Sequence, residues 1–91
     1  NFPNHLYVMA EEILKKNKLS FDILRPLILE TAKKIQKNSP SQMQTGPAKR
    51  GDKKIINEHL KMLNSFPDYK KLYKLLSFGI IKTEEKKQGH I

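Results

Sequence analysis

The chain has 91 residues, a formal net charge of +9, 37% hydrophobic and 30% charged residues, and no cysteine. This length suits one small domain with a modest core, and the composition excludes a disordered chain, a disulfide framework and a thiolate metal site. No apolar run approaches the roughly 18 residues of a membrane span, and a chain without cysteine is typical of the reducing cytosol, so we expect a cytoplasmic location and no membrane partner.

The positive charge raises nucleic acid as a possible partner. However, the lysines are spread along the whole chain, and only two of the 18 basic residues, Arg25 and Arg50, are arginines. Arginine is the usual reader of base edges, and a lysine-rich helix face is more often simply solvated. We therefore keep a standalone basic module that binds nucleic acid as an alternative, and we do not expect nucleic acid as the main partner.

The first segment, residues 3–17, is predicted to form a helix because apolar residues recur in it at intervals of three and four. Pro3 suits the first turn of that helix. The polar pair Asn4 and His5 follows in the same turn, beside the apolar stripe. This pair either lines a pocket or caps a fraying helix end, and the spacing alone does not decide between them.

The second segment opens at Ser20, which can act as an N-cap, and its predicted buried stripe runs from Phe21 to Ile35. Pro26 lies inside this pattern. Because proline lacks a backbone donor, it predicts either a kinked helix or a short turn that leads into a main helix from Leu27.

A stretch without helical period separates the second helix from the third. It runs from Asn38 to Gly51, and within it residues 40–43 are compatible with one helical turn. Connections of that length are uncommon in small helical domains and are often functional. Because Pro47 disfavours the α region at Gly46, the stretch is predicted to be a shaped loop.

Several groups that can bind a ligand stand close together in this loop. Thr45 offers a hydroxyl and Arg50 a cation, while Asp52 is predicted to be the N-cap of the next helix. One interpretation is a loop that presents donors to an anionic or carbonyl-bearing ligand. The other is an ordinary connection between helices whose charges are solvated.

The third predicted helix, residues 52–64, carries His59 on its apolar face. This histidine is either a core-edge residue with one hydrogen bond or a ligand-binding or proton-transfer group. The fourth helix follows a break at residues 66–68 and keeps its apolar spacing to Ile80, with Gly79 as an interruption.

The chain offers no strand candidate, no internal repeat and no phosphate-binding or dinucleotide-binding glycine pattern. Its three histidines show no metal-ligand spacing, so we expect no metal. The residues by themselves therefore carry no recognisable active site.

A family resemblance adds to this interpretation. Residues 44–52, which read QTGPAKRGD, and the following His59 and Leu60 resemble the T-G-P-x-x-R-G-D…H-L signature of one helical domain. That domain forms the C-terminal part of uncharacterised Rossmann-like proteins named as NAD(P)-dependent oxidoreductases. The start at residues 4–6 resembles the family's S-N-x-L helix start, with Pro3 in place of the small residue. The resemblance covers about residues 2–80.

The resemblance implies an all-α fold, a small bundle of about four main helices with a long functional loop between the second and third. It is similar to the C-terminal domains of 6-phosphogluconate dehydrogenase, ketopantoate reductase and pyrroline-5-carboxylate reductase. Residues 1–82 would form a substrate and dimerisation domain and residues 83–91 a flexible tail. Because the chain begins at Asn1 without a methionine, we expect it to be a fragment whose preceding Rossmann domain holds NADP or NAD.

The resemblance also implies which residues face a cleft for substrate or cofactor. Arg50 would pair with a substrate carboxylate or a cofactor phosphate, and Asn4 would hydrogen-bond a carbonyl or amide. Hydride transfer would be the chemistry of the cofactor. The expected partners are a small-molecule substrate, the Rossmann domain and a second copy of the chain. The full set of expected cleft residues is Asn4, His5, Thr45, Gly46, Pro47, Arg50 and His59.

A further interpretation, compatible with the oxidoreductase domain, is that the chain is a protein–protein interaction module. Its apolar face on the fourth helix would be buried against a second copy of the chain, and the residues of that face are Leu72, Tyr73, Leu76 and Ile80.

Overall fold

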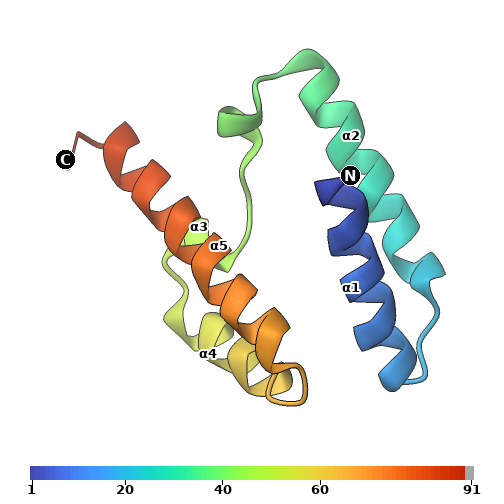
Figure 1. Cartoon of the computed structure of the whole chain (residues 1–91). Helices are drawn as coiled ribbons and strands as arrows, with labels where there is room; N and C mark the ends of the chain where they lie inside the picture. The colour runs from blue at the N-terminus through green and yellow to red at the C-terminus, as the bar shows by residue number, and fades with distance from the viewer. Residues whose placement is uncertain (90–91) are drawn as a thin grey trace. The chain divides into compact units, whose positions relative to one another are not determined.

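The computed structural model describes residues 1–89, and all regular secondary structure in that range is helical (Figure 1). The all-α prediction is therefore confirmed. The chain divides into two compact units, Asn1–Met43 and the part from Gln44 onward. Along the chain the elements are α1 (Phe2–Lys16), η1 (Phe21–Leu24), α2 (Arg25–Lys37), η2 (Pro40–Met43), α3 (Pro47–Arg50), α4 (Lys53–Met62) and α5 (Pro67–Lys87), where η denotes a 3₁₀ helix.

In the first unit, α1 begins where the side chain of Asn1 accepts a hydrogen bond of 2.8 Å from the backbone N–H of Phe2. At the other end, the side-chain amide of Asn17 donates to the carbonyl of Ile13 at 2.8 Å. These contacts satisfy backbone groups that a helix end leaves free. In Figure 1 the helices α1 and α2 lie alongside each other, with η1 preceding α2.

The structure distinguishes the two alternatives for Pro26, a kinked helix or a short turn that leads into a main helix. The hydroxyl of Ser20 accepts from the backbone N–H of Asp22 at 3.1 Å, so Ser20 caps a 3₁₀ turn. Helix α2 then starts at Arg25, with Pro26 in its first turn, where the missing backbone donor costs nothing. The short turn before a main helix is the form that the chain adopts.

The core of the first unit is small. Met9 is its only buried residue, and Phe21 is half-buried. The stripe predicted along α2 is buried less far than expected, because Thr31 is exposed and Ile35 is 43% exposed. The hydroxyl of Thr31 donates to the carbonyl of Leu27 at 2.9 Å, which satisfies it within its own helix.

The second unit is built from α3, α4 and α5, and Ala48 on α3 is its buried centre at 6% exposed. The short α3 contacts both α4 and α5. Between α4 and α5, the backbone N–H of Phe66 donates to the carbonyl of Leu63 at 2.9 Å, which closes a tight turn.

Helix α5 continues to Lys87, five residues past the domain boundary expected at residue 82. Residues 83–87 of the expected tail are therefore helical, and its last two residues lie outside the described part of the chain.

Candidate functional site

The loop between α2 and α4 has a defined backbone that depends on Gly46. This residue adopts φ 104° and ψ 172°, a region that is essentially restricted to glycine. It is the N-cap of α3, and its carbonyl accepts from the backbone N–H of Arg50 at 3.2 Å. Pro47 occupies the first turn of α3, where a proline is tolerated. The backbone is shaped at Gly46 as predicted, but residues 47–50 form the short helix α3 and not a loop.

The end of α3 leads directly into α4. Gly51 caps α3 in the left-handed region with φ 70°, and the backbone N–H of Asp52 donates to the carbonyl of Pro47 at 2.9 Å. The carboxylate of Asp52 then accepts from the backbone N–H of Ile55 at 3.2 Å. The predicted role of Asp52 as N-cap is confirmed.

Charged side chains tie α3 to the C-terminal turns of α5. The ammonium of Lys49 lies 4.0 Å from one carboxylate oxygen of Glu84, and Lys87 lies 2.6 Å from the other. The Glu84 side chain is only 15% exposed, so solvent screens these pairs less than pairs on an open surface. At 4.0 Å the Lys49–Glu84 pair is weak, so the position of α3 depends mainly on buried Ala48 and on its contacts with α4 and α5.

Two of the expected ligand groups remain accessible on this fixed loop. Thr45 is exposed, and the Arg50 side chain is 59% exposed. The nearest carboxylate to the Arg50 guanidinium is that of Asp52, at 3.8 Å, which is a long and weak pair. Thr45, Gly46, Pro47 and Arg50 therefore lie on one short turn of chain, with the arginine available to an external anion.

His59 makes a specific contact between α4 and α5. Its Nδ1 lies 2.7 Å from the hydroxyl oxygen of Tyr73, and the two rings meet edge to face at 5.6 Å. Burial raises the pKa of the Tyr73 hydroxyl above its ordinary value, and a hydrogen bond from Ser77 opposes that rise. His59 is thus a half-buried residue whose ring is held by a neutral phenol.

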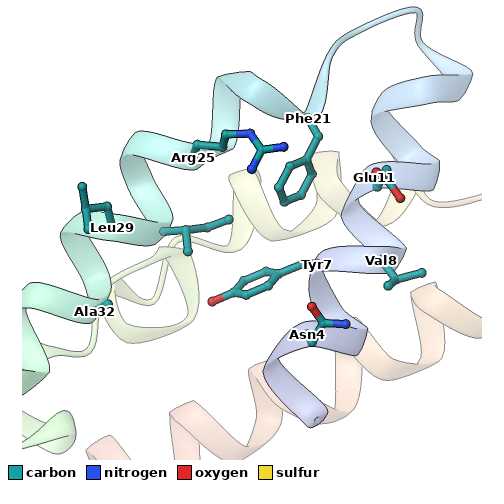
Figure 2. Close-up of a pocket in the computed structure, with 9 residues that line it drawn as sticks. Asn4, Tyr7, Val8, Glu11, Phe21, Arg25, Leu29 and Ala32 are labelled. Carbon is teal, nitrogen blue, oxygen red and sulfur yellow. The ribbon is translucent and has the colours of Figure 1, made fainter.

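A second candidate site is an open groove in the first unit, between α1 and the η1–α2 segment (Figure 2). Its volume is about 530 Å³. Tyr7 and Phe21 contact each other edge to face at 6.5 Å inside it. The lining residues are Asn4, Tyr7, Val8, Glu11, Phe21, Arg25, Ile28, Leu29 and Ala32.

Arg25 supplies the positive charge of this groove. Its guanidinium lies 5.3 Å from the centroid of the Phe21 ring and donates to the carboxylate of Asp22 at 2.6 Å. The hydrogen bond and the charge of Arg25 lower the pKa of the Asp22 carboxyl, and a smaller contribution comes from Ser20. Because most of Arg25 is exposed, this pair orients the guanidinium more than it stabilises the fold.

The expected site residues thus divide between the two units. Asn4 lines the groove of the first unit, while His5 is exposed and is not among the lining residues. The second unit brings Thr45, Gly46, Pro47 and Arg50 together on its loop, and it holds His59 against Tyr73.

Among residues 1–89, no three His, Cys, Asp or Glu side chains are grouped so that they could hold a metal ion. In the same range, none of the helices has the length and apolar character needed to cross a membrane.

Sequence reasoning missed two features of these sites. Tyr73 was assigned only to an apolar face, although its position on α5 brings its hydroxyl to His59. No sequence signal indicates this pairing, because the two residues lie on different helices. Tyr7 and Glu11 were also missed, although they stand three and seven residues after Asn4 and therefore share its helix face.

Comparison with known proteins agrees with this fold. The family model described as "Domain of unknown function (DUF2520)" matches residues 1–80. A crystal structure from Bacteroides fragilis, described as a "putative NADP oxidoreductase", matches with 48% identity and a TM-score of 0.88. That match covers 91% of this chain and 32% of the other, so the chain spans about a third of the length of that protein. No curated protein shows significant similarity to the chain.

Proposed function

Because the chain belongs to the DUF2520 family of domains, we propose that it is the helical domain of an NADP-dependent oxidoreductase. The observation that carries this proposal is the agreement of both sequence and fold with one part of the Bacteroides fragilis protein. A match at that level of identity supports a shared role for the domain, beyond a shared fold.

The proposal divides the work between this chain and a second domain. The helical domain would extend through the end of α5 at Lys87, and a Rossmann domain that precedes it would hold most of the NADP. The coverage of only 32% of the solved relative leaves room for such a domain. The described residues fit this division, because they offer an exposed cation for a contact with the cofactor but no glycine-rich cradle for its phosphates.

In this proposal the loop of the second unit presents Arg50 and Thr45 to the substrate or to a cofactor phosphate. The loop is held by buried Ala48 and by the backbone of Gly46, so little conformational entropy is lost when a ligand binds. The guanidinium can bind a carboxylate or phosphate with two parallel hydrogen bonds. NADP, when bound, would supply the hydride chemistry, while these residues would bind and orient.

Asn4 has a separate role in the proposal. It stands in the first turn of α1 on the wall of an otherwise mostly apolar groove, and its amide can donate to a carbonyl or accept from an amide. A few polar groups in a mainly apolar pocket are typical of sites that orient a small molecule. His5 is proposed only as a neighbour of this site, since its side chain is exposed.

We also propose that the domain forms a homodimer through the outer face of α5. The apolar side chains that this helix exposes are Leu75 (67%), Leu76 (48%) and Phe78 (58%). The face expected from the sequence is shifted, because Leu72, Tyr73 and Ile80 are half-buried within the second unit. A row of exposed apolar residues on one helix favours association with another protein surface.

The role of Arg50 is tested in the complete gene product that contains this chain. Arg50→Gln is expected to weaken binding of NADPH or of a substrate carboxylate about tenfold or more, because it removes a charge-assisted pair of hydrogen bonds. Titration of NADPH fluorescence and steady-state KM values measure the two effects. Lys53→Gln, which removes a nearby exposed lysine, serves as the charge control. Equal behaviour of both variants and the wild type would reject a ligand role for the loop.

A further inference from the structure

The contact between His59 and Tyr73 includes a third residue. Ser77 lies one helical turn after Tyr73 on α5, and it lowers the pKa of the Tyr73 hydroxyl. The distance of 2.7 Å between that oxygen and Nδ1 of His59 is short, as for a strong hydrogen bond. All three residues are half-buried, so the contact is partly shielded from water.

The direction of the hydrogen bonds follows from the chemistry of the groups. A phenol is a better donor than acceptor, and an imidazole nitrogen accepts well, so the short contact is best made by the Tyr73 hydroxyl donating to Nδ1 of His59. Tyr73 is protonated at neutral pH, since the ordinary pKa of a tyrosine is about 10 and burial raises it further. The only hydrogen on the phenolic oxygen then points to Nδ1 of His59. A neutral imidazole that accepts at Nδ1 carries its own proton on Nε2.

The second ring nitrogen of His59, Nε2, is available for a hydrogen bond to a ligand. His59 contacts Tyr73 in both its hydrogen bond and its ring contact, and no described residue accepts a hydrogen bond from Nε2. The ring is held edge to face at 85° to the Tyr73 ring, which restricts its rotation. The result is an oriented N–H donor that is fixed before any ligand arrives.

We propose that Tyr73 is a positioning residue that fixes His59 as the Nε2–H tautomer, so that His59 donates a hydrogen bond to the carbonyl oxygen of the substrate. The ligand half of this statement rests on the proposed oxidoreductase function, whereas the tautomer half does not. A neutral imidazole suits this task, because it polarises a carbonyl without bringing a charge into the site.

A purely structural role would have different consequences. A contact that only ties α4 to α5 needs the short distance between the rings but not a particular tautomer. It would also serve with the hydrogen bond reversed, with Nδ1–H donating to the phenolic oxygen. The location of the imidazole proton therefore separates a positioned donor from a simple structural tie.

The tautomer is measured by long-range ¹H–¹⁵N NMR on the ¹⁵N-labelled 91-residue chain at neutral pH, with His59→Gln to assign the signals. We expect a protonated Nε2 and an accepting Nδ1 in the wild type, together with a slowly exchanging Tyr73 hydroxyl proton. Tyr73→Phe should remove that hydroxyl signal and shift the Nδ1 resonance, while Tyr69→Phe on the same helix should leave both unchanged. A proton on Nδ1, or an unchanged His59 in Tyr73→Phe, would overturn the proposal.

The carbonyl role is measured on the complete gene product with ¹⁵N-labelled histidine and pyruvate as the probe. Propionate, which has the same carboxylate but no ketone, is the matched control. We expect the Nε2–H proton of His59 to shift with pyruvate and not with propionate, and this shift to be lost in His59→Gln. No shift, or equal shifts with both acids, would overturn the carbonyl role. Failure of the same protein to bind NADPH would instead overturn the proposed function and leave the tautomer result intact.

Discussion

At the scale of single residues, the Asp22–Arg25 pair is the contact with the clearest effect on a titration. The guanidinium donates at 2.6 Å and lowers the pKa of the Asp22 carboxyl below its ordinary 3.8. Because the folded-state pKa is the lower one, the pair stabilises the fold above pH 3.8. That contribution is lost as the pH falls from 3.8 through the folded-state value.

Arg25→Gln is therefore expected to raise the pKa of Asp22 toward 3.8. The measurement is a pH titration of side-chain carboxyl ¹³C shifts. Arg50→Gln, which removes the other arginine of the chain, is the control and should leave Asp22 unchanged. If Arg25→Gln leaves the titration of Asp22 where it was, the pair does not form in solution.

Single residues also differ in how well the sequence predicts their contacts. Asp52 was predicted as an N-cap from its place before an apolar period, and its carboxylate does accept from Ile55. The sequence does not decide between a core-edge and a ligand role for His59, because it does not show which residue of another helix contacts the His59 ring. An N-cap can be predicted from neighbouring residues in the sequence. The contact between His59 and Tyr73 depends instead on how α4 and α5 pack.

At the scale of elements, the loop before α4 depends on one glycine. Gly46→Ala is expected to destabilise the chain by about 1–3 kcal/mol, because a side chain at φ 104° and ψ 172° is strained. Gly79→Ala is the matched control. It lies inside α5 with open space around the new methyl group and should stabilise the chain by about 0.5–1 kcal/mol.

Urea unfolding followed by circular dichroism measures both changes. The two variants add the same methyl group, so opposite signs can only come from the backbone at each site. Similar stabilities for the two variants would mean that the loop does not hold the conformation described here.

The elements also show which patterns the sequence predicts well. Ser20, Pro26 and the apolar spacing predicted a turn and a helix, and both are present as η1 and α2. The two short helices in the following connection were harder to predict. The turn at residues 40–43 was only compatible with the sequence, and α3 has four residues, too few to show a period.

At the scale of the whole molecule, the apolar face of α5 predicts a dimer. Phe78→Glu is expected to convert it to a monomer, because a buried, unpaired carboxylate is costly in an interface. Light scattering coupled to size-exclusion chromatography measures the mass. Met62→Glu is the control. It replaces an apolar side chain on α4 that is 72% exposed with the same charged group, and it should leave the dimer intact. A wild-type monomer at all concentrations would reject this interface.

The all-α class and the main helices could be predicted at this scale, because helical periodicity is a local property of the sequence. The division into two units could not, since a chain of 91 residues was expected to form one small domain. The candidate site was predicted best where one turn of chain carries it, at residues 45–50. The groove of the first unit was predicted least well, because its walls are formed by side chains from α1 and from the η1–α2 segment.

The central claim is that this chain is the helical domain of an NADP-dependent oxidoreductase. It is tested most directly by titrating NADPH, followed by its fluorescence, into the complete gene product and into the 91-residue chain alone. We predict saturable binding with a Kd on the order of micromolar for the complete protein and none for the isolated chain. Absence of saturable NADPH binding to the complete protein would contradict the claim.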